Sequence, residues 1–154
     1  MSVYLLALLI GIIAGLRAMT APAAVAWATY LGRLDLGGTW LAFLGNLWVR
    51  WILTALALVE LVTDQLPSTP SRTVPVQFGA RILTGALSGA AVAAASGSWV
   101  GGLLAGAIGA VVGTLGGRAV RAKLAAAFGS DRPAAFIEDA VAIGGALLIG
   151  VALR

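Results

Sequence analysis

Charged side chains inside or beside apolar stretches are the residues of this sequence with the clearest chemical potential. They are Arg17, Glu60, Asp64, Glu138 and Asp139. A charge at the centre of a helix surrounded by lipid costs about 2.5–3.5 kcal/mol, so such residues usually face a partner or a wet cavity. The five residues are therefore candidates for binding an ion, a proton or a charged solute.

Glu60 and Asp64 are four residues apart, a spacing that places both on one face of a helix. Two carboxylates on one face could bind a cation or share a proton, because both do not ionise cheaply side by side. The alternative is that these acids reach water and pair with Arg72 or Arg81.

Glu138 and Asp139 lie four to five residues into the last apolar segment. They could join Glu60 in handling a cation or a proton. The alternative is purely structural, since acids in the first turns of a helix are stabilised by the helix dipole.

Arg17 follows an almost wholly apolar run and, with Thr20, could hold a carboxylate or an anionic headgroup. The alternative is a charge that marks the membrane edge. If 3–31 is one tilted span, Arg17 is central, and its expected partner is then Glu60 or Glu138.

The composition identifies the environment of these residues. Of 154 residues, 60% are hydrophobic and 10% are charged, and the mean hydropathy is +1.01. A soluble domain carries about 25% charged residues. These values exclude an ordinary soluble enzyme, a disordered chain and a nucleic-acid module, and they indicate an integral membrane protein. The net charge of +4 fits the positive-inside bias of membrane proteins rather than nucleic-acid binding.

The sequence contains no cysteine and no histidine. Their absence removes disulfides, thiolate metal sites and the commonest general base and zinc or haem ligand. We therefore expect no metal and no cofactor, and any proton chemistry must use carboxylates.

Long runs of Ala, Leu, Gly and Val without alternation predict an all-α bundle of membrane helices. Pro22 should kink or break the first of them. A separate crossing within 22–50 would raise the count from five segments to six. The loop between the second and third segments contains Pro67, Pro70, Ser71, Arg72 and Pro75. We expect this loop to cap one mouth of the site and Ser71 and Arg72 to belong to the binding residues. The expected segments are 3–31, 51–66, 76–97, 100–117 and 134–153.

The basic residues suggest an orientation. With five segments, the amino terminus shares a side with Arg72 and with the basic patch at 118–132. The positive-inside rule then places the amino terminus inside. We expect a single membrane domain, 1–154, in a prokaryotic inner membrane.

Two half-length units, 1–75 and 76–154, echo each other weakly. If each half crosses the membrane an odd number of times, the repeat is inverted and would place a site at the interface of the halves. The alternative is chance similarity between low-complexity helices. The matching segments are 23–26 with 90–93, 44–53 with 115–124, and 58–60 with 136–138.

Glycines recur at four-residue spacing, and such small-residue ridges let helices approach closely in lipid. The simpler interpretation is packing within the chain. The alternative is a homodimer along the helix that carries Gly102, Gly106, Gly109, Gly113 and Gly117.

Three motifs carry a family resemblance over essentially the whole chain. They are Gly15-Leu-Arg-Ala-Met-Thr-Ala-Pro22, Val59-Glu-Leu-Val-Thr-Asp-Gln-Leu-Pro-Ser-Thr-Pro-Ser-Arg72 and Ile137-Glu-Asp-Ala-Val-Ala142. With them the chain resembles an uncharacterised prokaryotic integral membrane family, domain of unknown function 4126. The resemblance implies a multi-span membrane domain and assigns no role to any residue.

We expect a transporter or channel for a small solute or ion, in which intramembrane carboxylates and Arg17 form the site. The alternative is a scaffold or lipid-binding protein without transport, in which acid–arginine pairs fix the fold. An enzyme is not expected, because a lipid-modifying site would have to work without histidine or cysteine.

Overall fold

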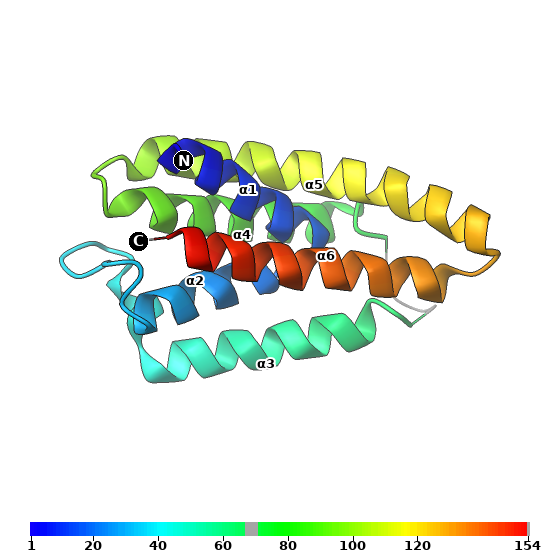
Figure 1. Ribbon diagram of the computed structural model, residues 1–154, viewed down its shortest axis with the longest axis horizontal. Coiled ribbons are helices and arrows are strands. Elements are labelled where there is room, and N and C mark those ends of the chain that lie inside the picture. Colours follow the sequence, from blue (N-terminus) through cyan, green and yellow to red (C-terminus); the bar gives the residue numbers. More distant parts are fainter. Residues whose placement is uncertain (67–70, 154) are drawn as a thin grey trace.

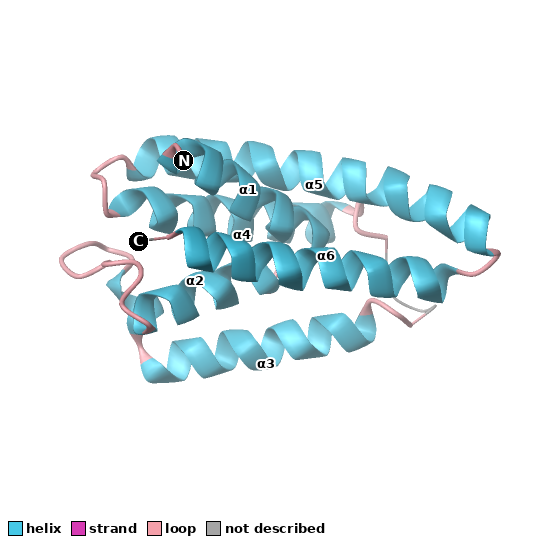
Figure 2. Cartoon of the chain, in the orientation of Figure 1, coloured by secondary structure: helices cyan, strands magenta, loops and turns pink. Residues whose placement is uncertain are grey.

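The computed structural model describes residues 1–66 and 71–153, and this part of the chain is helical without any strand (Figures 1 and 2). The all-α prediction is therefore confirmed. Pro67 and Pro70 of the predicted loop lie outside the described residues. The elements are α1 (Val3–Leu16), α2 (Thr20–Tyr30), the 3-10 turn η1 (Ala42–Gly45), α3 (Leu47–Thr63), α4 (Pro75–Ala94), α5 (Trp99–Phe128) and α6 (Asp131–Ala152).

Three helices, α4, α5 and α6, are long and apolar enough to cross a membrane. Helix α3 has 17 residues, or about 26 Å at the rise of an α-helix, and α1 has 14 residues. These helices support the membrane assignment. The number of five or six segments stays a prediction.

The first predicted span is wrong, because residues 3–31 form two helices that run in opposite directions (Figure 1). Arg17, before α2, bonds Asp139 of α6, and Arg33, after α2, bonds Val151. Helix α2 therefore runs parallel to α6, whereas α1 runs the other way. The two helices are about 21 and 17 Å long, shorter than a hydrocarbon core of about 30 Å, and together they form a helical hairpin.

The hairpin turns at residues 17–19, before the proline that was expected to break it. Helix α1 ends at Leu16, and Arg17 is extended, with φ −142° and ψ 109°. Pro22 is the third residue of α2. A proline is tolerated in the first turn of a helix, where its missing N–H has no helical partner. Pro22 therefore continues α2 instead of interrupting a span.

Glycines bring α1, α4 and α5 into backbone contact. A methyl group on Gly106 of α5 would come within 2.1 Å of the carbonyl oxygen of Gly85 in α4. A methyl group on Gly113 would come within 2.2 Å of the carbonyl oxygen of Ile12 in α1. The four glycines at 102, 106, 109 and 113 are buried inside the chain. Internal packing therefore accounts for these four glycines, as the simpler interpretation predicted, whereas Gly117 is only partly buried. The homodimer stays a prediction.

Both chain termini lie at the same end of the bundle (Figure 1). Arg72 pairs with Glu138 in the first half of α6 and lies near Gly117 of α5, so it lies towards the opposite end of the bundle. The expectation that the amino terminus shares a side with these basic residues is therefore wrong. The two halves also differ in structure. The first half begins with the hairpin of α1 and α2, whereas the second half begins with the single 20-residue helix α4. The inverted repeat is not confirmed.

Candidate functional site

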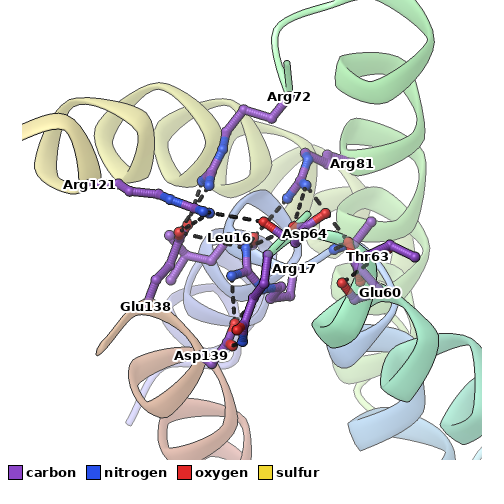
Figure 3. Close-up of polar contacts among 12 residues, drawn as sticks. Leu16, Arg17, Glu60, Thr63, Asp64, Arg72, Arg81, Arg121, Glu138 and Asp139 are labelled. Carbon is purple, nitrogen blue, oxygen red and sulfur yellow. Dashed lines mark hydrogen bonds and ion pairs between the residues drawn. The ribbon is translucent and has the colours of Figure 1, made fainter. Parts of the chain in front are cut away.

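A buried cluster of arginines and carboxylates gathers around the tip of the hairpin (Figure 3). It draws on the α1–α2 turn and on α3, α4, α5 and α6, and its positive and negative side chains are equal in number. Most of these side chains come from sequence positions far apart. The members of this ionic cluster are Arg17, Arg72, Arg81, Arg121, Glu60, Asp64, Glu138 and Asp139.

Arg17 is the centre of the ionic cluster, and its side chain is 0% exposed. Its Nε donates to Asp139 Oδ1 at 2.7 Å, and its Nη2 lies 2.5 Å from the same oxygen. Its Nη1 donates to Asp64 Oδ2 at 2.9 Å and lies 3.6 Å from Glu138 Oε2. One guanidinium thus joins α3 and α6 to the hairpin tip. Glu138 was an expected partner, whereas Asp64 and Asp139 were not.

Glu60 binds the hairpin tip through the backbone instead of through Arg17. The amide of Ala18 donates to Oε1 at 2.7 Å, and the amide of Met19 donates to Oε2 at 2.8 Å. These amides stand at the positive, amino-terminal end of α2, a natural place for an anion. The nearest cation of an ion pair with Glu60 is Arg81, whose Nη2 lies 3.7 Å from Oε1.

Arg81 binds the carboxyl-terminal end of α1, on the other side of the hairpin turn. Its Nη1 donates to the carbonyl oxygens of Gly15 at 2.9 Å and Leu16 at 2.8 Å. The last carbonyls of a helix lack partners within that helix and carry partial negative charge. Arg81 Nη2 also lies 3.5 Å from Asp64. Arg81 of α4 therefore partners the free carbonyls at the end of α1, and Glu60 of α3 partners the free amides before α2.

Arg72 and Arg121 close the ionic cluster around Glu138. Both nitrogens of the Arg72 fork bond Glu138, with Nη2 to Oε2 at 2.9 Å, and Arg121 Nη1 reaches Oε2 at 3.2 Å. Arg121 also bonds Asp131 at 2.6 Å and the carbonyl oxygen of Asp64 at 3.2 Å. These two arginines cover the cluster at the end of the bundle away from the chain termini.

Two of the predicted site residues lie outside the ionic cluster. Thr20 is buried at the start of α2 and lines a hollow between α2, α3 and α6. Ser71 is exposed, and its hydroxyl lies 3.0 Å from that of Thr73. The six charged residues predicted for the site all lie in the cluster.

Sequence reasoning named Arg81 only as an alternative partner of Glu60 and Asp64, a pairing that the structure shows, and it missed Arg121 and Gln65 as members of the site. Arg81 interrupts an apolar helix six residues after Pro75, the same signal that identified Arg17. Arg121 lies in a basic patch that suggested only the membrane side. The amide of Gln65 donates to Asp139 at 3.1 Å, and no sequence pattern announces this bond.

The neighbouring acids of α6 face two different hollows. Glu138 lines an apolar hollow of about 290 Å³ between α1, α5 and α6. Asp139 lines a hollow of about 520 Å³ between α3 and α6. Arg17 contacts both acids, so it stands between the two hollows.

The described residues contain no group of three or more acids, histidines or cysteines placed to hold a metal ion. Glu60 and Asp64 share a helix face as predicted, but arginines and backbone amides meet their charge. In this conformation the acids bind groups of the chain itself.

The fold and the ionic cluster define an all-helical protein of membrane type, with a helical hairpin whose tip is held by buried charges. The sequence model of the family described as "Domain of unknown function (DUF4126)" matches residues 4–152, so the chain belongs to this family. No curated protein and no solved structure matches the chain.

Proposed function

We propose that the protein moves a small ion or solute across the membrane and that the ionic cluster is its closed gate. The observation that carries this proposal is the hairpin tip, where Glu60 fills the amide end of α2 and Arg81 fills the carbonyl end of α1. In many transporters, the ends of broken helices bind the charged groups of substrates and coupling ions. Here side chains of the chain occupy these places.

Helix α3 is the proposed moving element. It packs against α2 and η1, and its carboxyl end reaches the rest of the bundle through Glu60, Asp64 and Gln65. If this end of α3 withdraws, two negative charges leave the tip, while Arg17 and the free amides of α2 remain. A small anion would then be attracted to the vacated place, because both the guanidinium and the helix end favour negative charge.

Protonation of Glu60 would couple this movement to a proton. A neutral carboxyl group binds the amides of Ala18 and Met19 less strongly than a carboxylate does. The proton and the anion would therefore favour the same open state. In this proposal, Glu60 and the solute compete for the same backbone amides at the start of α2.

Flux into proteoliposomes tests the proposal, with chloride, acetate and phosphate as separate probes. Glu60→Gln should stay folded and change the flux of at least one probe by about tenfold or more, since ~1.4 kcal/mol of altered binding is a factor of ten. Asp35→Asn is the matched control, because Asp35 is an exposed acid in the loop after α2. Equal flux for wild type, both variants and empty liposomes would contradict the proposal.

The second candidate is a structural role, in which the ionic cluster only stabilises the fold. The observation that favours it is that all the charges of the ionic cluster are paired. Every charged side chain of the ionic cluster has an oppositely charged partner within 4 Å. In this case Glu60→Gln would lower stability and no probe would cross. The flux and unfolding measurements together separate the two candidates.

We also propose a multi-pass arrangement in a prokaryotic cell membrane with the ionic-cluster end inside. The exposed basic residues Arg118, Lys123 and Arg132 belong to this end, and the positive-inside rule places such residues in the cytoplasm. A cysteine introduced at Ser2 should then react with a membrane-impermeant maleimide added to whole cells. Protection of Ser2→Cys in intact cells would reverse the orientation.

A further inference from the structure

A lateral groove follows most of the length of α6, first between α6 and α3 and then, towards the chain termini, between α6 and α2. It consists of three adjoining hollows of about 520, 240 and 250 Å³. The first two share Leu61 and Ile143, and the last two share Trp27 and Leu147. We call this continuous surface the α3–α6 groove.

The middle of the α3–α6 groove is apolar and narrow. Small side chains form its floor and sides, including Ala23, Ala24, Ala57 and Ala146. From Arg132 to Leu147 the groove follows α6 for about 22 Å, whereas one leaflet of the hydrocarbon core is about 15 Å thick. The groove is thus long enough for an acyl chain that starts at one membrane surface and ends near the midplane.

The two ends of the groove are basic. Arg132 lines the end near the ionic cluster, and Arg33 lines the end near the chain termini. Arg132 is exposed and takes part in none of the ion pairs among the described residues. The acid beside it, Asp139, is already bound by Arg17 and Gln65. An uncompensated guanidinium therefore stands at the mouth of an apolar channel.

We propose that the α3–α6 groove binds one anionic phospholipid, with its phosphate at Arg132 and an acyl chain along Ile143 towards Trp27. An apolar groove open to the bilayer suits lipid chains, and a guanidinium at the membrane surface favours an anionic headgroup. The bound lipid would separate α3 from α6 next to Asp139. This inference does not depend on the proposed transport activity.

Lipid retention measured by native mass spectrometry tests the site. The full-length protein is reconstituted with equal amounts of phosphatidylglycerol and phosphatidylcholine, extracted in mild detergent, and compared as wild type, Arg132→Gln and Lys123→Gln. Wild type should retain phosphatidylglycerol preferentially. Arg132→Gln should lower this preference about fivefold, the factor that ~1 kcal/mol per basic residue implies. Lys123→Gln, which removes an exposed charge outside the groove lining, should keep it.

A second variant tests the groove itself. Ala57→Trp puts a large ring into the middle hollow and should reduce retention of both lipids. Equal retention of the two lipids by wild type, or equal loss of preference in Arg132→Gln and Lys123→Gln, would overturn the proposal. A stable wild-type dimer without lipid that Ala57→Trp dissociates would also overturn it, because a second chain would then cover the groove.

Discussion

The two sides of the bundle are held together in different ways. Helices α1, α4 and α5 meet backbone to backbone at Gly106 and Gly113, where no room remains for even a methyl group. Helix α3 packs on α2 and η1, and its carboxyl end is held by Glu60, Asp64 and Gln65. Ion pairs can exchange partners with water, protons or solutes, whereas backbone contacts cannot. The side held by charge is therefore the side that we expect to move.

Removal of Arg17 should have the largest effect on stability. Arg17→Ala leaves Asp64 and Asp139 without their main positive partner in a buried place. Loss of one member of a buried ion pair costs about 3–5 kcal/mol. Arg17→Lys keeps the charge but loses the planar fork, so its cost should be smaller. Unfolding in mixed micelles measures both variants, and equal stability of Arg17→Ala and wild type would show that the pairs contribute nothing.

A methyl group in the glycine-packed side should have the next largest effect. Gly106→Ala forces the backbones of α4 and α5 apart, because the added carbon would lie 2.1 Å from a carbonyl oxygen. Overpacking of this kind costs about 1–3 kcal/mol. Gly116→Ala is the matched control on the same helix, since a methyl group there has no neighbour within 4 Å. If the two variants unfold alike, the glycine contacts are not what joins these helices.

The hydrogen bond that joins the middle of α3 to α2 should be the easiest attachment to weaken. The indole Nε1 of Trp27 donates to Thr54 Oγ1 at 2.9 Å and joins α2 to α3. Thr54→Val removes this bond and also the bond that Thr54 Oγ1 donates to the carbonyl oxygen of Arg50 at 2.8 Å, each worth about 1 kcal/mol. Trp27→Phe removes the bond between Trp27 and Thr54 from the other side, so the double variant should lose less than the sum of the single losses. Strict additivity in unfolding experiments would show that this bond contributes little.

A buried arginine outside the ionic cluster shows that a neighbouring acid is only one way to hold such a charge. Arg50 lies at the other end of α3, stacked over the ring of Tyr30 at 3.6 Å and near Trp27 at 4.8 Å. Aromatic faces attract a guanidinium without neutralising it. Aromatic contact thus holds one end of α3, while the ionic cluster holds the other. This difference explains why we place the gate at Glu60 and not at Arg50.

Much of the ionic cluster was visible in the sequence because charge in apolar helices is rare. Arg17, Glu60, Asp64, Glu138 and Asp139 each stood out for this single physical reason. The pairing was not visible, since it depends on how α3 and α6 pack around the tip. Glu60, for example, binds backbone amides that no side-chain pattern reveals.

The hairpin could not be distinguished from a kinked span by periodicity alone. Residues 3–31 are apolar almost throughout, and Pro22 marked a break at the wrong place because prolines also suit first turns. The glycine ridge was recognised, but its partner was not, because a ridge packs equally well against its own chain or a second one. Both outcomes depend on tertiary contacts between α1, α4 and α5.

The distance between α3 and the rest of the bundle tests the central claim most directly. Because the chain has no cysteine, spin labels at Val62→Cys and Leu147→Cys report only on α3 and α6, and labels at Leu5→Cys and Ile108→Cys report on α1 and α5. In liposomes we predict two distances for the first pair, with their ratio altered by Glu60→Gln, and one distance for the second. A single unchanged distance for both pairs would contradict a gate at the ionic cluster.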